Sequence, residues 1–215
     1  MNATATATVN TSAASNYDEA ADYIWNNSFD KPTLVVSRAR VGVQYDALQA
    51  GLGDARIHYA VKANPAPEII RMLVERGSGF DAASRQEIEL CLSQGADPAK
   101  ISFGNTIKRG VDIAFAHSIG VTMFAADCEA ELDKIAEHAP GARVYIRLIV
   151  ENSMADWPLT RKFGCAGSLL PSLLEYTKSV GLVPYGLSFH VGSQTRRAEY
   201  WHPVLDQVAP LWHAA

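Results

Sequence analysis

The chain contains the stretch Ile57-His58-Tyr59-Ala60-Val61-Lys62-Ala63-Asn64, and Pro65 follows it directly. Apolar, aromatic and β-branched residues dominate its first five positions, which is typical of a buried strand. A lysine is unusual there, because an ammonium group is rarely buried without a partner. Lys62 either ends an edge strand and reaches solvent, or lies at the carboxyl end of an α/β-barrel strand, where such barrels carry their chemistry. In the second case, desolvation favours a neutral amine that can form a Schiff base.

After this stretch, short apolar strands alternate with helical patterns, which predicts an α/β fold with a parallel sheet. The predicted strands cover residues 57–63, 79–83, 101–104, 122–126, 143–149 and 185–191. Pro67 opens a helix that Gly77 closes, Ser84 and Glu87 form a capping box, and Asp127 is expected to cap a later helix. No dinucleotide-binding glycine motif follows the first strand. The pattern therefore favours a (β/α)8 TIM-type barrel, of which this chain carries about six βα units.

Composition narrows the class of protein. The chain has 215 residues, of which 48% are apolar and 20% charged, and its net charge is −4. We expect no nucleic-acid or membrane partner, because there is no basic field and no apolar run of about 18 residues. The three cysteines, Cys91, Cys128 and Cys165, lie far apart, which predicts buried free thiols rather than a metal site or disulfides. This cysteine usage indicates a cytoplasmic protein.

Three segments are expected along the chain. Residues 1–16 are rich in Ala, Thr, Asn and Ser, carry no charge and lack the features of a signal peptide, so we predict a disordered tail. Residues 17–56 should hold a helix over 17–27, a strand over 33–37 and a lead-in helix. Residues 57–215 should form the partial barrel.

Polar residues stand near the carboxyl ends of the predicted strands. They are Lys62, Asp81, Asn105, Asp127, Arg147 and His190. Helix capping explains some of them. Four of these residues are a lysine, an aspartate, an arginine and a histidine, which we expect at one edge of the sheet. Such a combination suits the binding of a phosphate-bearing aromatic cofactor.

Three motifs in order carry a family resemblance. They are Tyr59-Ala60-Val61-Lys62-Ala63-Asn64, Phe80-Asp81-Ala82-Ala83-Ser84 and Phe189-His190-Val191-Gly192-Ser193. Together they resemble the fold type III, alanine-racemase-like decarboxylases that use pyridoxal 5′-phosphate. Diaminopimelate decarboxylases share the lysine motif, but Leu159-Thr160-Arg161-Lys162-Phe163-Gly164 is more similar to the ornithine/lysine decarboxylase branch.

The resemblance implies a role for each matching residue. Lys62 would hold pyridoxal 5′-phosphate covalently and later transfer protons, and His190 would stack its ring on the cofactor; these two are the expected catalytic residues. Asp81 and Arg147 would lie beside the cofactor. Ser193 would bind the phosphate together with backbone N–H groups of the Gly192 turn.

The implied activity is decarboxylation of a basic amino acid, with L-ornithine giving putrescine for polyamine biosynthesis, in a homodimer. Lys162 would reach across the dimer interface. In the family, two further barrel strands bring a glycine-rich phosphate loop and a glutamate, and a C-terminal β-domain completes the site. None of these has a counterpart here, so the resemblance predicts the N-terminal part of a decarboxylase that is inactive alone.

Two alternatives stay open. One is a non-catalytic pyridoxal-phosphate carrier, although such chains complete their barrel and carry a phosphate loop near the end. The other is a regulatory decarboxylase homologue, although such proteins tend to lose the cofactor residues that Lys62, His190 and Ser193 represent here. The sequence leaves the choice among ornithine, lysine, arginine and diaminopimelate undecided.

Overall fold

The computed structural model describes residues 17–151, 162–193, 195 and 197–215. The chain divides into two compact units, Met1–Arg56 and Ile57–Ala215. The predicted disordered tail over 1–16 lies outside the described residues.

The described part of the first unit holds two helices, α1 (Tyr17–Trp25) and α2 (Arg38–Leu52). Ser37 caps α2, since its hydroxyl accepts a hydrogen bond from the backbone N–H of Arg40 at 3.3 Å. The predicted strand over 33–37 is wrong. That segment pairs with none of the described strands, and an extended segment without a neighbour has no ladder in which to satisfy its backbone groups.

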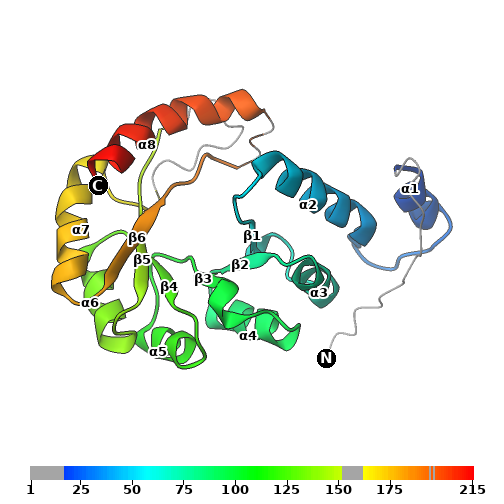
Figure 1. The fold of residues 1–215 in the computed structure, drawn as a ribbon. Coiled ribbons are helices and arrows are strands. Elements are labelled where there is room, and N and C mark those ends of the chain that lie inside the picture. The colour runs from blue at the N-terminus through cyan, green and yellow to red at the C-terminus, as the bar shows by residue number, and fades with distance from the viewer. Residues whose placement is uncertain (1–16, 152–161, 194, 196) are drawn as a thin grey trace. The chain divides into compact units, whose positions relative to one another are not determined.

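The second unit is built on a parallel sheet whose strands follow one another in chain order, with β1 and β6 at its two edges. The strands are β1 (His58–Ala60), β2 (Gly79–Ala82), β3 (Ile101–Phe103), β4 (Met123–Ala126), β5 (Arg143–Arg147) and β6 (Val183–Ser188). Figure 1 shows the strands fanning out along an arc. Sequential parallel order with an intervening helix is the arrangement of (β/α) barrels, so the predicted partial barrel is confirmed at the level of topology.

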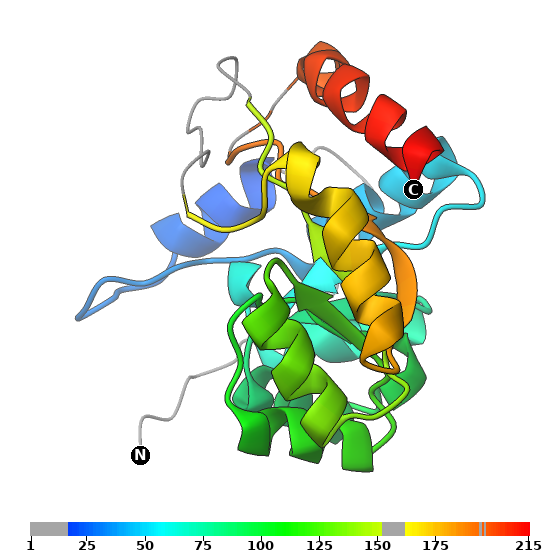
Figure 2. The same cartoon turned by 90° about the vertical axis from the view of Figure 1, so that its left-hand side faces the viewer.

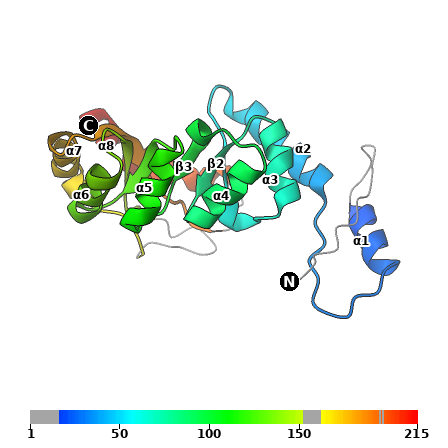
Figure 3. The ribbon, with the colours of Figure 1, turned by 90° about the horizontal axis from the view of Figure 1, so that it is seen from below.

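Helices cover one side of this sheet. They are α3 (Pro67–Glu75), α4 (Arg85–Ser93), α5 (Gly110–Ser118), α6 (Glu129–His138), α7 (Leu170–Ser179) and α8 (His202–Ala214), with short 3₁₀ turns η1 (Val61–Ala63), η2 (Pro98–Lys100), η3 (Gly167–Leu169) and η4 (Ala198–Trp201). Figure 3 shows α3 to α6 following one another along the outside, and Figure 2 shows α6 and α7 over the strands.

The core lies between these helices and the sheet. Its large side chains are fully excluded from solvent, among them Phe80, Phe103, Phe124, Ile70, Leu73, Ile88, Ile113, Leu132 and Ile135. Each such side chain contributes about 1.5–3 kcal/mol on burial. This packing holds the carboxyl ends of the strands in place, where the polar residues lie.

The predicted helix signals are mostly correct. Ser84 caps α4 by accepting from the N–H of Glu87 at 3.3 Å, while the Glu87 carboxylate accepts from the N–H of Ala83 at 2.6 Å. The expected capping role of Asp127 is wrong. Cys128 occupies the N-cap position of α6 without a side-chain hydrogen bond, and Asp127 is engaged elsewhere, as described below.

Most strands end earlier than predicted on the side that carries the polar residues, whereas β4 ends at Ala126 as predicted. β1 stops at Ala60, and Lys62 lies in the turn η1 rather than in a strand. Pro65 keeps Asn64 extended, so the chain must turn between the strand and that residue before α3 begins. Arg147 is the last residue of β5, and His190 follows the end of β6.

Candidate functional site

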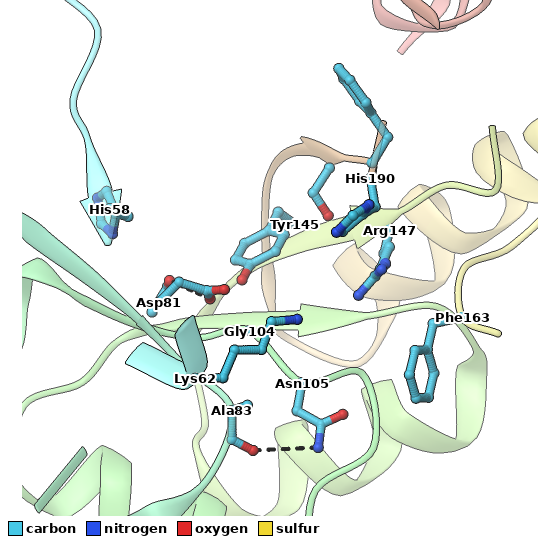
Figure 4. A pocket seen from close by; sticks show the side chains of 13 residues that line it. His58, Lys62, Asp81, Ala83, Gly104, Asn105, Tyr145, Arg147, Phe163 and His190 are labelled. Carbon is cyan, nitrogen blue, oxygen red and sulfur yellow. Dashed lines mark hydrogen bonds between the residues drawn. The ribbon is translucent and has the colours of Figure 1, made fainter. Parts of the chain in front are cut away.

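A cavity of about 520 Å³ lies at the carboxyl ends of the parallel strands. Its lining comes from β1, β2, β3, β5 and β6 and from segments that follow them in the chain (Figure 4). The lining residues are His58, Lys62, Asp81, Ala83, Ser102, Gly104, Asn105, Tyr145, Arg147, Phe163, Ser188, Phe189 and His190. Four of the five predicted cofactor residues therefore meet in one cavity, and Ser193 is not among its lining.

Lys62 enters the cavity from the turn η1. The Tyr59 hydroxyl donates to the carbonyl oxygen of Asn64 at 3.2 Å and so closes the turn that carries the lysine. The Lys62 residue is exposed and not buried. Figure 4 shows its amine extending into the space between Asp81 and Arg147. A flexible, accessible amine in that position can react with an aldehyde.

Asp81 projects from the middle of β2 into the same cavity. Burial raises the pKa of its carboxyl group, while a hydrogen bond from Ser102 and the positive charges of Lys62, His58 and Arg147 act in the opposite direction. The Ser102 hydroxyl donates to Oδ1 of Asp81 at 3.2 Å. A carboxyl group with a perturbed pKa beside an amine and a guanidinium group is characteristic of a functional site.

Arg147 is held over an aromatic ring. Its guanidinium carbon lies 5.5 Å from the ring centroid of Phe163, within the range of a cation–π interaction.

The segment that carries Phe163 is held by the next residue, Gly164. Gly164 donates its N–H to Oδ2 of Asp127 at 2.8 Å, and this hydrogen bond is the role of the Asp127 carboxylate in the structure. Gly164 has φ +107°, and a Cβ atom there would lie 2.7 Å from the backbone carbon of Leu148, so only glycine fits. The segment that carries Phe163 is thus tied to the ends of β4 and β5.

His190 lies in the loop after β6 with its ring orientation fixed. The backbone N–H of Gly192 donates to its Nδ1 at 2.9 Å, so Nδ1 is unprotonated in this arrangement. Burial lowers the pKa of His190, and the charges of Arg147 and Lys62 lower it further. The imidazole is therefore a neutral, flat ring at neutral pH. Phosphate binding by Ser193 and the backbone N–H groups of the Gly192 turn stays a prediction.

Acidification is expected to destabilise the chain through His190. Its pKa in the folded chain lies below the ordinary value of 6.5. Between those two values the unfolded chain binds a proton that the folded chain does not, so the free energy of unfolding falls as the pH drops below about 7. Urea unfolding at about pH 7 and about pH 5.5 measures this, and the decrease should be smaller in the His190→Gln variant. An equal decrease in both proteins would contradict the assignment.

Sequence reasoning missed four polar strand residues that line the cavity: His58 on β1, Ser102 on β3, Tyr145 on β5 and Ser188 on β6. Burial and the nearby charge of Asp81 raise the pKa of Tyr145, so its hydroxyl stays protonated. The available signal was a polar residue within an otherwise apolar strand pattern, whereas α/β barrels are expected to carry functional residues at the strand ends.

Comparison with protein families decides the class. Residues 38–214 match the family model described as pyridoxal-dependent decarboxylase, pyridoxal binding domain. The chain belongs to this family. Membership confirms the resemblance and the cofactor class that the three motifs indicate.

Individual relatives agree with this family. The chain is 38% identical to the decarboxylase flvG of Aspergillus flavus over 172 residues, covering 80% of this chain and 40% of that protein. It is 38% identical to antizyme inhibitor 2 of Xenopus laevis over 135 residues, covering 63% of this chain and 30% of that protein. The crystal structure of lysine decarboxylase from Selenomonas ruminantium superposes with a TM-score of 0.81 at 31% identity, covering 95% of this chain and 53% of that one.

These comparisons confirm the α/β fold as part of a barrel of the decarboxylase type. The chain spans about half the length of the solved relative and 40% of the first curated one. Among the described residues, no helix is both long and apolar enough to cross a membrane.

Proposed function

We propose that this protein decarboxylates a basic amino acid with the help of pyridoxal 5′-phosphate, and that L-ornithine is its substrate and putrescine its product. The observation that carries the proposal is the meeting of Lys62, Asp81, Arg147 and His190 in one cavity at the carboxyl ends of parallel strands. This is the place where α/β barrels bind substrates. Family membership supports the reaction class, and the similarity to the ornithine branch supports the substrate.

The residues of the cavity fit the cofactor. A volume of about 520 Å³ lies in the usual range for small-molecule sites, which is about 300–1,000 Å³. Lys62 supplies an accessible amine for an aldehyde, and His190 supplies a neutral ring for an aromatic face. The cations of Lys62 and Arg147 suit an anionic ligand.

When bound, pyridoxal 5′-phosphate supplies an electron sink for the electron pair that remains when carbon dioxide leaves an amino acid. The amine of Lys62 would hold the cofactor and, once displaced by the substrate amine, would give or take a proton at Nζ. His190 stays uncharged and oriented through its Nδ1 contact with Gly192. Arg147, supported by Phe163, keeps a positive charge at the rim of the cavity.

We further propose that the active protein is a cytoplasmic homodimer. Lys162 would contribute to the interface between its two subunits; this lysine is exposed and directly precedes Phe163 of the cavity wall. An exposed ammonium group at that position is available to pair with a carboxylate of a second subunit. Size measurement in solution, with Lys162→Ala for comparison, tests this role.

A regulatory role is the second candidate, favoured by the similarity to antizyme inhibitor 2. The two candidates differ in one observable property, the turnover of an amino acid. The presence of Lys62 and His190 in one cavity supports the enzyme. A regulatory homologue has no need for a reactive amine beside a neutral imidazole.

Carbon dioxide release is the decisive measurement. Both the 215-residue chain and the longest product of its coding sequence should be assayed with ornithine, lysine, arginine and diaminopimelate. We expect release that depends on added cofactor, is fastest with ornithine and vanishes in Lys62→Ala. Binding of the cofactor without release from any of these amino acids would contradict the enzyme and favour a carrier or a regulatory protein.

A further inference from the structure

The carboxylate of Asp81 contacts two residues of the neighbouring segment, one on β3 and one directly after it. Ser102 on β3 is 4% exposed, and its hydroxyl donates to Oδ1 of Asp81 at 3.2 Å, which is a shorter contact than that to its other acceptor, the carbonyl oxygen of Phe80 at 3.4 Å. Gly104 follows β3 directly, and a Cβ atom built on it would lie 1.8 Å from the same Oδ1. The carboxylate thus fills the space that any larger residue at position 104 would need.

The backbone of Gly104, next to the Asp81 carboxylate, is held by a hydrogen bond between strands. The N–H of Gly104 donates to the carbonyl oxygen of Ala82 at 2.8 Å, which extends the β2–β3 ladder past the end of β3. The conformation of Gly104 is not one that favours glycine, because its φ lies outside the left-handed region. Space for the carboxylate, and not backbone freedom, is therefore what glycine provides here.

Other groups face Asp81 from the remaining strands. Figure 4 shows the hydroxyl of Tyr145 on β5 directed toward Asp81. The charged groups that act on the carboxylate are Lys62, His58 and Arg147, and all three favour its ionised form. Its protonation thus depends on a balance between burial on one side and Ser102, Lys62, His58 and Arg147 on the other.

We propose that Ser102 and Gly104 are positioning residues that hold the Asp81 carboxylate in one orientation and so set its interaction with the Lys62 amine. The inference rests on the proposed function, in which Asp81 and Lys62 belong to the cofactor site. Ser102 supplies the donor that fixes Oδ1, and Gly104 supplies the space in which Oδ1 lies. Both residues line the cavity, and the role assigned to them here is exerted through their contact with Asp81.

The first test is a titration of Asp81 in the cofactor-free chain. Aspartate carboxyl carbons are followed by NMR in isotope-labelled protein, and the signal that Asp81→Asn removes is assigned to Asp81. The Ser102→Ala variant should raise the pKa of Asp81 further, because it removes a hydrogen bond to the ionised form. Ser102→Thr keeps the hydroxyl and should restore the original titration. Ser172→Ala, an exposed serine on α7, is the matched control and should change nothing.

The second test measures cofactor capture. Gly104→Ala should displace the carboxylate and weaken the binding of pyridoxal 5′-phosphate about tenfold, and Ser102→Ala should shift the pH at which capture is half complete. Circular dichroism checks that both variants fold. If Gly104→Ala does not fold, Ser102→Ala alone decides the question.

The outcomes separate the two proposals. An unchanged Asp81 titration in Ser102→Ala overturns the positioning role while leaving the proposed function intact. A wild-type chain that never captures the cofactor overturns the proposed function, and the titration still tests whether Ser102 orients Asp81.

Discussion

Lys62→Ala is expected to abolish covalent capture of pyridoxal 5′-phosphate. The lysine is exposed in the cavity formed at the strand ends, so its amine is accessible to an aldehyde. Alanine removes the only atom at this position that can form the bond. Borohydride reduction in the presence of the cofactor makes the bond permanent, and peptide mass spectrometry then locates the added mass. We expect it in the peptide that contains Lys62 in the wild type, and complete loss from that peptide in the variant.

Two controls separate reactivity from charge. Lys100→Ala and Lys178→Ala remove exposed lysines elsewhere on the second unit and should leave the modification unchanged. Lys62→Arg keeps the positive charge but has no amine that can lose its proton at neutral pH, so it should behave like alanine. An unmodified Lys62 peptide in the wild type, or equal modification in wild type and Lys62→Ala, would refute the assignment.

Glu131→Leu is expected to destabilise the chain by about 3–5 kcal/mol, because it breaks a buried ion pair from one side. Glu131 on α6 accepts from the Lys108 amine at 2.8 Å, and the two side chains are 4% and 0% exposed. Its other oxygen accepts from Lys134 at 2.5 Å. Removing this one carboxylate leaves both ammonium groups without their counter-charge.

The cost arises from Lys108 itself. Desolvation lowers the pKa of this lysine to about 8, although the attraction of Glu131 opposes the shift. Its amine also donates to the carbonyl oxygens of Asn105 at 2.8 Å and Ala125 at 2.6 Å. The cluster therefore joins α6, the end of β4 and the loop that places Asn105 on the wall of the cavity. Loss of the pair should loosen that wall as well as the fold.

Urea unfolding measures the effect, and the chain contains a matched exposed pair. Arg85 and Glu89 on α4 lie 2.7 Å apart, but their side chains are 40% and 45% exposed. Glu89→Leu should therefore change the free energy of unfolding by only about 0–1 kcal/mol. Combining Lys108→Met with Glu131→Leu should recover part of the loss, because no unpaired charge then remains on Lys108. Similar effects of Glu131→Leu and Glu89→Leu would rule out the buried pair as a determinant of stability.

Much of the fold and of the site could be predicted from local patterns. Alternation of strand-like and helical segments predicts the order of β1 to β6, because each βα unit is recognisable within about 30 residues. Local patterns predict Lys62, Arg147 and His190 because each stands at or just after a strand end, and Asp81 because it stands one residue before the end of β2. Parallel strands bring those ends to one edge. The segment over 33–37 misled the prediction, since its composition is strand-like and nothing local reveals whether a partner is present.

By itself, the sequence determined the succession of βα units and the chemical types of the residues at the rim, because periodicity and strand ends are local properties. Only the tertiary structure showed that Asp127 accepts a hydrogen bond from Gly164 and that the N–H of Gly192 orients the ring of His190. It also showed that Ser102 and Gly104 contact the carboxylate of Asp81. The bond between Gly192 and His190 is local, but the others join strands and loops that lie 21 to 37 residues apart in the chain. Their hydrogen bonds and free space exist only after the strands have packed side by side.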